Sequence, residues 1–162
     1  MLLDTLWWFG QKARAAKVLE EARKRGVFLE AFRQTKLVWS LDVHRMSVGA
    51  ALTSLSIWLI DIRRLVLDGE YIPQLVSIVT VQGELGQKND TRGFPIAKAV
   101  HSFLKDLVAR FSYAAWNNGR IIYNQLQLKR WFSKSYLDQA IALENSLFPI
   151  LGAMIGSTYV EK

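Results

Sequence analysis

The stretch that decides the fold is Leu75-Val-Ser-Ile-Val-Thr-Val81. Its β-branched residues favour a strand. A strand needs a pairing partner, however, and no second stretch of this kind stands out along the chain, so a lone strand here would not be stable. We therefore expect a helix over residues 75–81, with a strand as the alternative. On this interpretation the chain is all-α, an irregular helical bundle of about five or six helices.

Helical spacing of apolar residues extends outward from this stretch in both directions. A basic amphipathic helix is expected at the N-terminus, ended by Gly26 as a C-terminal cap. Pro95 suits the first turn of a long central helix. The expected helices cover residues 1–26, about 27–43, about 45–67, 95–132 and a last segment from about 135, and a glycine-bearing loop covers 83–95. All of them are expected to form one domain over residues 1–162.

Three runs carry no charge: Met46 to Ile60, Tyr71 to Gly83 and Asn145 to Val160. The first would be about 22 Å long as a helix, against a bilayer hydrocarbon core near 30 Å. We therefore expect a buried core helix there, and a helix embedded in a membrane or buried at an interface is the alternative. Association with a membrane is favoured, although the compartment is unknown. No cleavable signal peptide is evident, because Asp4 interrupts the apolar start and the first cations follow it.

Composition excludes several kinds of chemistry. The chain has 162 residues, no cysteine and a net charge of +7. Without cysteine it cannot form disulfides, thiolate metal sites or thiol nucleophiles. No phosphate-binding glycine motif or serine-nucleophile motif occurs. We therefore expect no cofactor, no bound metal and no enzyme activity.

The two histidines, His44 and His101, are far apart in the sequence and match no metal-binding spacing. Asp42 and His44 are two residues apart, and such residues do not face one way on a helix. Both histidines are therefore interpreted as structural.

A helical stripe is predicted in the central helix. Its residues follow one another at steps of three and four: Tyr113, Trp116, Arg120, Tyr123, Gln127 and Arg130. Tyr, Trp and Arg are enriched where proteins meet lipid headgroups, nucleic acid or other subunits. We expect this stripe to contact a partner, and the alternative is a central helix with core contacts on two sides.

A second candidate contact is the N-terminal aromatic group, which consists of Trp7, Trp8 and Phe9. Cations follow it, beginning with Lys12 and Arg14. Such a pattern is typical of a helix that lies in a membrane interface. It also fits a helix whose aromatic end docks onto the protein while its basic part is solvated.

A third candidate is the G-x-x-x-G motif formed by Gly152 and Gly156. Small residues four apart allow two helices to approach closely. We expect this edge to pack against another helix.

Together these patterns indicate a non-enzymatic structural or interaction subunit of a larger assembly, associated with a membrane. Other protein subunits are the expected partners, and a membrane surface is a further one. The alternative is a helical module that binds nucleic acid, which the net charge of +7 favours.

Overall fold

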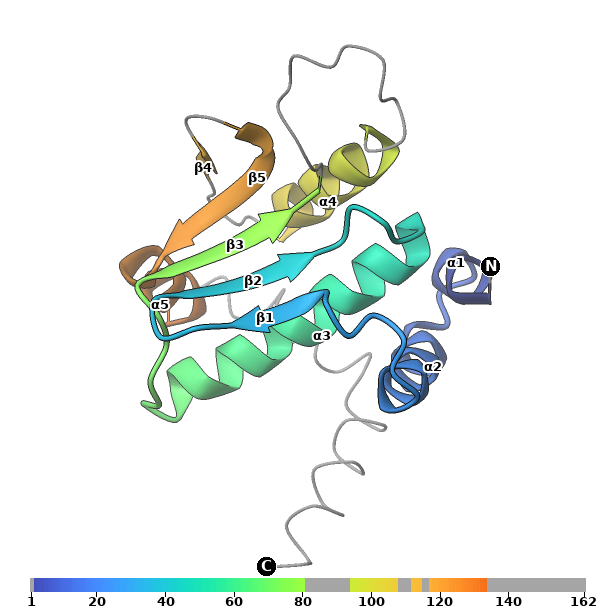
Figure 1. Ribbon diagram of the computed structural model, residues 1–162, viewed down its shortest axis with the longest axis horizontal. Helices are drawn as coiled ribbons and strands as arrows, with labels where there is room; N and C mark the ends of the chain where they lie inside the picture. Colours follow the sequence, from blue (N-terminus) through green and yellow to red (C-terminus); the bar gives the residue numbers. More distant parts are fainter. Residues whose placement is uncertain (1, 81–93, 108–111, 115–116, 134–162) are drawn as a thin grey trace, which may run out of the picture.

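The computed structural model describes residues 2–80, 94–107, 112–114 and 117–133, and Figure 1 shows their arrangement. Five helices and five strands lie in these ranges. In chain order they are α1 (Leu2–Trp8), α2 (Lys12–Lys24), β1 (Phe32–Gln34), β2 (Val38–Asp42), α3 (Val48–Leu67), β3 (Leu75–Val79), α4 (Phe94–Asp106), β4 (Ser112–Ala114), β5 (Asn117–Asn124) and α5 (Gln125–Ser133).

The strands form one mixed sheet in the order β1-β2-β3-β5-β4. The central strand β3 pairs in parallel with β2 and antiparallel with β5. The fold is therefore α/β, and the prediction of an all-α bundle is wrong. The helix expected over residues 75–81 is wrong for the same reason. The segment forms the strand β3, and its pairing partners β2 and β5 lie in stretches that the sequence interpretation assigns to helices.

The long helix α3 carries most of the core. Ser47 caps its start by accepting a hydrogen bond from the backbone of Ala50, and every residue from Gly49 to Ile60 is buried. The helix contacts α1, α2, α4 and α5. A helix that is apolar all round is typical of such a buried position. Of the helices in the described ranges, none is both long enough and apolar enough to cross a membrane, so the membrane-embedded alternative is wrong.

Other expected boundaries change as well. The helix expected over residues 1–26 divides into α1 and α2 at Gly10, whose φ of 71° suits a glycine between two helices. The expected helix at 27–43 is replaced by β1 and β2, and the long helix at 95–132 is replaced by α4, β4, β5 and α5. Strand pairing overrides helical spacing in both places. Most of the loop expected at 83–95 lies outside the described residues.

Candidate functional site

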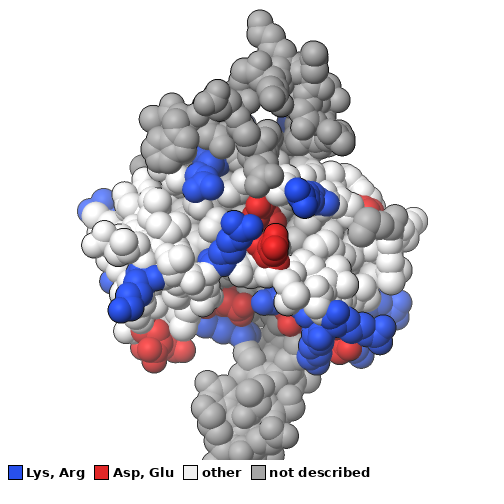
Figure 2. Space-filling view, in the orientation of Figure 1, with Lys and Arg blue, Asp and Glu red and all other residues white. Residues whose placement is uncertain are grey.

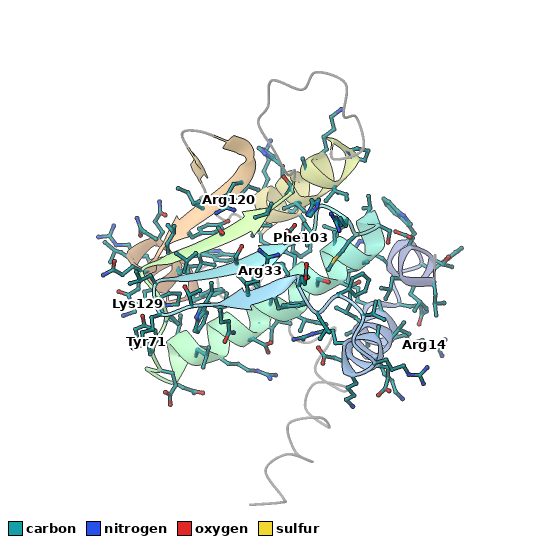
Figure 3. The ribbon with its side chains drawn as sticks, viewed as in Figure 1. Arg14, Arg33, Tyr71, Phe103, Arg120 and Lys129 are labelled. Atoms are coloured by element: carbon teal, nitrogen blue, oxygen red, sulfur yellow. The ribbon has the colours of Figure 1, made fainter. Side chains whose placement is uncertain are left out.

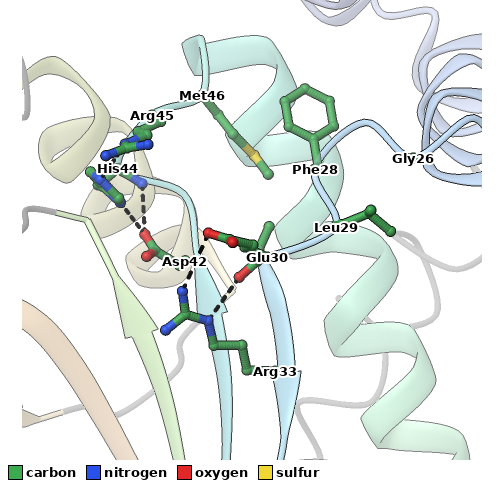
Figure 4. Close-up of a pocket in the computed structure, with 10 residues that line it drawn as sticks. Gly26, Phe28, Leu29, Glu30, Arg33, Asp42, His44, Arg45 and Met46 are labelled. Carbon is green, nitrogen blue, oxygen red and sulfur yellow. Dashed lines mark hydrogen bonds and ion pairs between the residues drawn. The ribbon is translucent and has the colours of Figure 1, made fainter.

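A pocket of about 340 Å³ lies at the end of β2, where the chain turns toward α3 (Figure 4). It is lined by Gly26, Phe28, Leu29, Glu30, Ala31, Arg33, Asp42, His44, Arg45 and Met46. These residues come from the segment after α2, from β1 and from the end of β2 with the turn that follows. Because β2 and β3 are parallel, the pocket lies beyond the carboxyl end of a parallel strand, where ligands commonly bind in α/β folds.

The side chains of Asp42 and Arg45 hold the imidazole of His44 in one orientation. Its Nδ1 contacts Asp42 Oδ1, and the same oxygen accepts the backbone N–H of His44 at 3.2 Å. Because a carboxylate is an acceptor, the proton lies on Nδ1 and leaves Nε2 as an acceptor. Arg45 Nε donates to that nitrogen at 3.1 Å. All three side chains are therefore linked within the pocket.

The sequence interpretation missed the contact between Asp42 and His44. It judged the spacing of Asp42 and His44 by the geometry of a helix, on which residues two apart diverge. Asp42 is instead the last residue of β2. Side chains two apart lie on the same side of an extended chain. The spacing was a usable signal only once the strand was recognised.

Arg33 brings a second cation to the pocket. In the β1–β2 register it lies opposite Ser40, so it shares a face of the sheet with Asp42. Its Nε donates to the Glu30 carbonyl oxygen at 3.0 Å, and its Nη2 lies 3.8 Å from Glu30 Oε2. Both side chains are exposed. An exposed ion pair of this kind is weak, so the guanidinium can exchange its partner for another anion.

The remaining wall of the pocket is apolar. Met46 is buried, Phe28 is partly buried and Leu29 is exposed. Phe28 has a φ of 62°, the left-handed region that non-glycine residues rarely occupy. Such strain tends to occur at ligand-binding sites. The pocket therefore combines cations with an apolar surface, which suits a ligand with an anionic part and a flat apolar part.

The charges around the pocket are mixed. In Figure 2, Lys and Arg side chains flank a small group of acidic side chains near the middle of the face that carries the strands. Within the described part of the chain, no group of three or more His, Asp or Glu side chains could hold a metal ion.

The N-terminal aromatic group divides into two parts. The ring of Trp7 is partly buried, with its centroid 5.9 Å from that of Phe103 and with Lys12 Nζ 5.0 Å above it. Trp8 and Phe9 point away from the core and are 72% and 78% exposed. Of the three rings, Trp7 alone thus packs against the protein.

The stripe predicted around Tyr123 does not exist as one helical face, because β5 ends at Asn124 and α5 begins at the next residue. Tyr123 is 1% exposed, and its ring stacks on that of Trp131 at 6.2 Å. Its hydroxyl oxygen is buried without a hydrogen-bond partner, and burial raises the pKa of this phenol above its ordinary value. Tyr123 is a core residue, so the partner contact predicted for it is wrong.

The other stripe residues are dispersed. Arg120 is partly buried on β5, while Arg130 is exposed on α5. The side chain of Tyr113 and all of Trp116 lie outside the described residues. Gly152 and Gly156 do so too, and their helix packing stays a prediction.

The proteins to which the chain is similar include three from plants. It is 51% identical over 160 residues to the pentatricopeptide repeat-containing protein At1g74850, chloroplastic, of Arabidopsis thaliana, a match that covers 94% of this chain and 18% of that protein. It is 29% identical to the pentatricopeptide repeat-containing proteins ATP4 homolog, chloroplastic, of Oryza sativa subsp. japonica and ATP4, chloroplastic, of Zea mays. Each of these two matches covers 88% of this chain and 20% of the relative. No known protein-family profile matches the chain.

The chain thus spans about a fifth of the length of these relatives. The prediction of membrane association is not supported, since the described helices include no membrane span.

Proposed function

We propose that this α/β domain binds single-stranded RNA, without catalysis, through the pocket at the end of β2. The observation that supports the proposal is that one pocket is lined by both cations and apolar side chains. The cations are Arg33 and Arg45, and the apolar side chains are those of Phe28 and Met46. A nucleotide presents the same two parts, an anionic phosphate and a flat base. Arginine is suited to phosphate because its guanidinium offers several donors in a fixed plane.

The relatives add independent support. Pentatricopeptide repeats are helical repeats that read single-stranded RNA one base at a time. The described part of this chain is a mixed sheet with helices, so it is unlike an array of such repeats. We infer that the matched segment of each relative is a separate domain carried by a repeat protein. A domain in that position would meet the same RNA strand as the repeats.

The excess of cations favours the same ligand. The net charge is +7, and residues 1–64, which include α1, α2 and the pocket, hold eleven Lys and Arg against six Asp and Glu. Such an excess attracts nucleic acid through its phosphates. The names of the three relatives include the word chloroplastic, and we propose the chloroplast as the compartment of this protein too.

The test is fluorescence anisotropy with a labelled single-stranded RNA of about twelve nucleotides, a length within the range that single-strand-binding domains cover. The Arg33→Ala/Arg45→Ala variant is expected to bind about tenfold more weakly at about 0.15 M salt. Two lost phosphate contacts should also reduce the slope of log affinity against log salt by about 1.4.

The matched control is Lys36→Ala/Lys129→Ala, which removes two exposed cations away from the pocket. Figure 3 shows Lys129 at the end of the molecule opposite Arg14. The control should retain the affinity and the slope of the parent. Equal losses in both variants would mean that binding is delocalised over the surface, and the pocket would then have no special role.

One observation favours a second candidate, the cleavage of RNA without a metal. His44 is oriented by Asp42, as a general base is oriented by a carboxylate in hydrolases. If Arg45 moves from Nε2 to a phosphate, Nε2 can accept the proton of a ribose 2′-hydroxyl. The 2′-oxygen then attacks the adjacent phosphorus, and the 5′-oxygen leaves and takes a proton from water. The hydroxide that this forms takes the proton from Nε2 and so restores water and neutral His44. The products are a 2′,3′-cyclic phosphate and a 5′-hydroxyl end.

This candidate is tested by incubating the protein and labelled RNA with a chelator and separating the products on a gel. Cyclic-phosphate ends that disappear in both His44→Ala and Asp42→Asn would support cleavage. Intact RNA bound by the parent protein would leave binding alone as the function.

A further inference from the structure

We infer that Trp8 and Phe9 form a second contact for RNA, a stacking surface for unpaired bases outside the pocket. The inference rests on the proposed binding of RNA and specifies that the RNA is single-stranded at this point. Bases stack readily on aromatic side chains regardless of sequence, so a pair of exposed rings is a suitable receptor.

The packing of α1 explains why these two rings are exposed. Leu3 is buried, and Leu6 and Trp7 pack against the core. These two residues lie three and four positions after Leu3, so all three share one face of the helix. Trp8 and Phe9 fall on the other side and stay 72% and 78% exposed. Large aromatic side chains are usually buried, so two adjacent exposed rings indicate a surface that meets a ligand.

The stacking surface formed by Trp8 and Phe9 is fixed by the attachment of α1 to α3. Asp4 Oδ1 accepts the backbone N–H of Gly49 at 2.6 Å, so α1 is bonded to the first turn of α3. A carboxylate at that position also suits the positive end of the helix dipole. Gly10, with a φ of 71°, then turns the chain into α2 directly after the two rings. Ordered rings lose little entropy when a base stacks on them.

Charge on the adjacent helix favours RNA over a protein as the ligand. Lys12, Arg14 and Lys17 lie at the start of α2, and residues 5–17 contain no Asp or Glu. Arg14 and Lys17 are exposed, and Figure 3 shows Arg14 at the outer side of α2. Cations beside exposed rings can contact the phosphates of a strand whose bases stack on the rings.

The position of the rings allows one strand to reach both sites. The helix α2 begins just after Phe9 and ends just before Gly26, which lines the pocket. Thirteen helical residues span about 20 Å. In Figure 1, α1 and α2 lie at the same end of the molecule as the start of α3, which follows the pocket residues in the chain. A short RNA should fill the pocket only, whereas a longer RNA should also contact Trp8 and Phe9.

The experiment compares single-stranded RNAs of about three and about twelve nucleotides, by anisotropy, in Trp8→Ala/Phe9→Ala and in the parent. We expect the longer RNA to bind about tenfold more weakly to the variant, within the range for the loss of base stacking. The shorter RNA should bind equally well to both. The Trp8→Tyr/Phe9→Tyr variant should retain the parent affinity, because it keeps both rings. Tyr71→Ala is the control, since Tyr71 is an exposed aromatic residue at the opposite end of the molecule (Figure 3).

Three outcomes would contradict the inference. The first is an unchanged affinity of Trp8→Ala/Phe9→Ala for the longer RNA while the parent binds it, which would leave the proposed function intact. The second is an equal loss for a fully paired RNA duplex, which offers no unstacked base. The third is a shift from dimer to monomer on size-exclusion chromatography at constant RNA affinity, which would assign the rings to protein contact. If the parent binds no RNA of either length, the proposed function itself fails.

Discussion

Two aromatic regions of this protein are similar in composition but differ in burial. The N-terminal aromatic group leaves Trp8 and Phe9 exposed, whereas the β5–α5 aromatic group, made of Tyr123, Trp131 and Phe132, is buried. In the second group the rings contact one another, with centroids 6.2 Å and 4.5 Å apart. Both regions have basic residues nearby in the sequence.

The difference follows from what lies next to each group. Tyr123 lies opposite Val76 in the β3–β5 pairing, so its ring shares a face of the sheet with that buried side chain. Helix α5 then brings Trp131 onto the ring. The helix α1 has only one face against α3 and leaves the other uncovered. An aromatic–basic pattern therefore does not itself distinguish a core from a binding surface. Substitutions in the two groups should separate these roles.

The largest difference is expected between Tyr123→Ala and Trp8→Ala. Removing a buried aromatic ring typically costs about 3–5 kcal/mol in the free energy of unfolding. Removing an exposed one should change it by no more than about 0.5 kcal/mol. Denaturant unfolding of both variants measures this contrast. A similar cost for the two would mean that the rings of the N-terminal group are core residues.

A smaller effect is expected at the attachment of α1. A Cβ atom added at Gly49 would lie within 2.6 Å of the Asp4 backbone nitrogen and the Leu3 carbonyl oxygen, both of which are backbone atoms that cannot rotate away. Gly49→Ala should therefore cost about 1–3 kcal/mol of stability, as overpacked substitutions do. It should also weaken binding of the longer RNA by displacing Trp8 and Phe9. Retained stability together with retained affinity would show that α1 is not anchored at this glycine.

The smallest effect is expected for Tyr123→Phe. This change removes a buried hydroxyl that has no hydrogen-bond partner and keeps the ring that stacks on Trp131. An unpaired buried polar group costs stability, so the variant should be as stable as the parent or more stable by about 1 kcal/mol. Thermal unfolding provides the measurement. A clear loss of stability would mean that the hydroxyl has a partner, such as a water molecule.

Some features of the fold could be predicted from the sequence, and others could not. Gly26 at the end of α2 and the buried helix near residues 45–67 follow from local signals, a glycine cap and a long uncharged run. The sheet could not be predicted in the same way. Its pairs join Leu75–Val79 to Val38–Asp42 on one side and to Asn117–Asn124 on the other, and such distant pairings leave no mark on the spacing within each segment.

The candidate site was missed for the same reason. Asp42 and His44 were visible as a pair, but their spacing places them together only on an extended chain. Arg33 and Arg45 come from either side of the β1–β2 hairpin, and only the register of that hairpin brings them into one pocket. The sequence singled out Trp7, Trp8 and Phe9 together as a candidate contact, and only the structure separates the exposed rings of Trp8 and Phe9 from Trp7.

The most direct test of RNA binding at the α1–pocket end is ultraviolet crosslinking of the parent protein to a single-stranded RNA of about twelve nucleotides, followed by mass spectrometry of the crosslinked peptides. We expect crosslinks in the segments that contain Trp8 and Phe9 and the pocket residues Phe28, His44 and Met46. The peptides around Leu37 and Tyr71, which carry exposed apolar side chains at the opposite end, should stay unmodified. Crosslinks concentrated at Leu37 and Tyr71, or none above the level of an unrelated protein, would contradict this account.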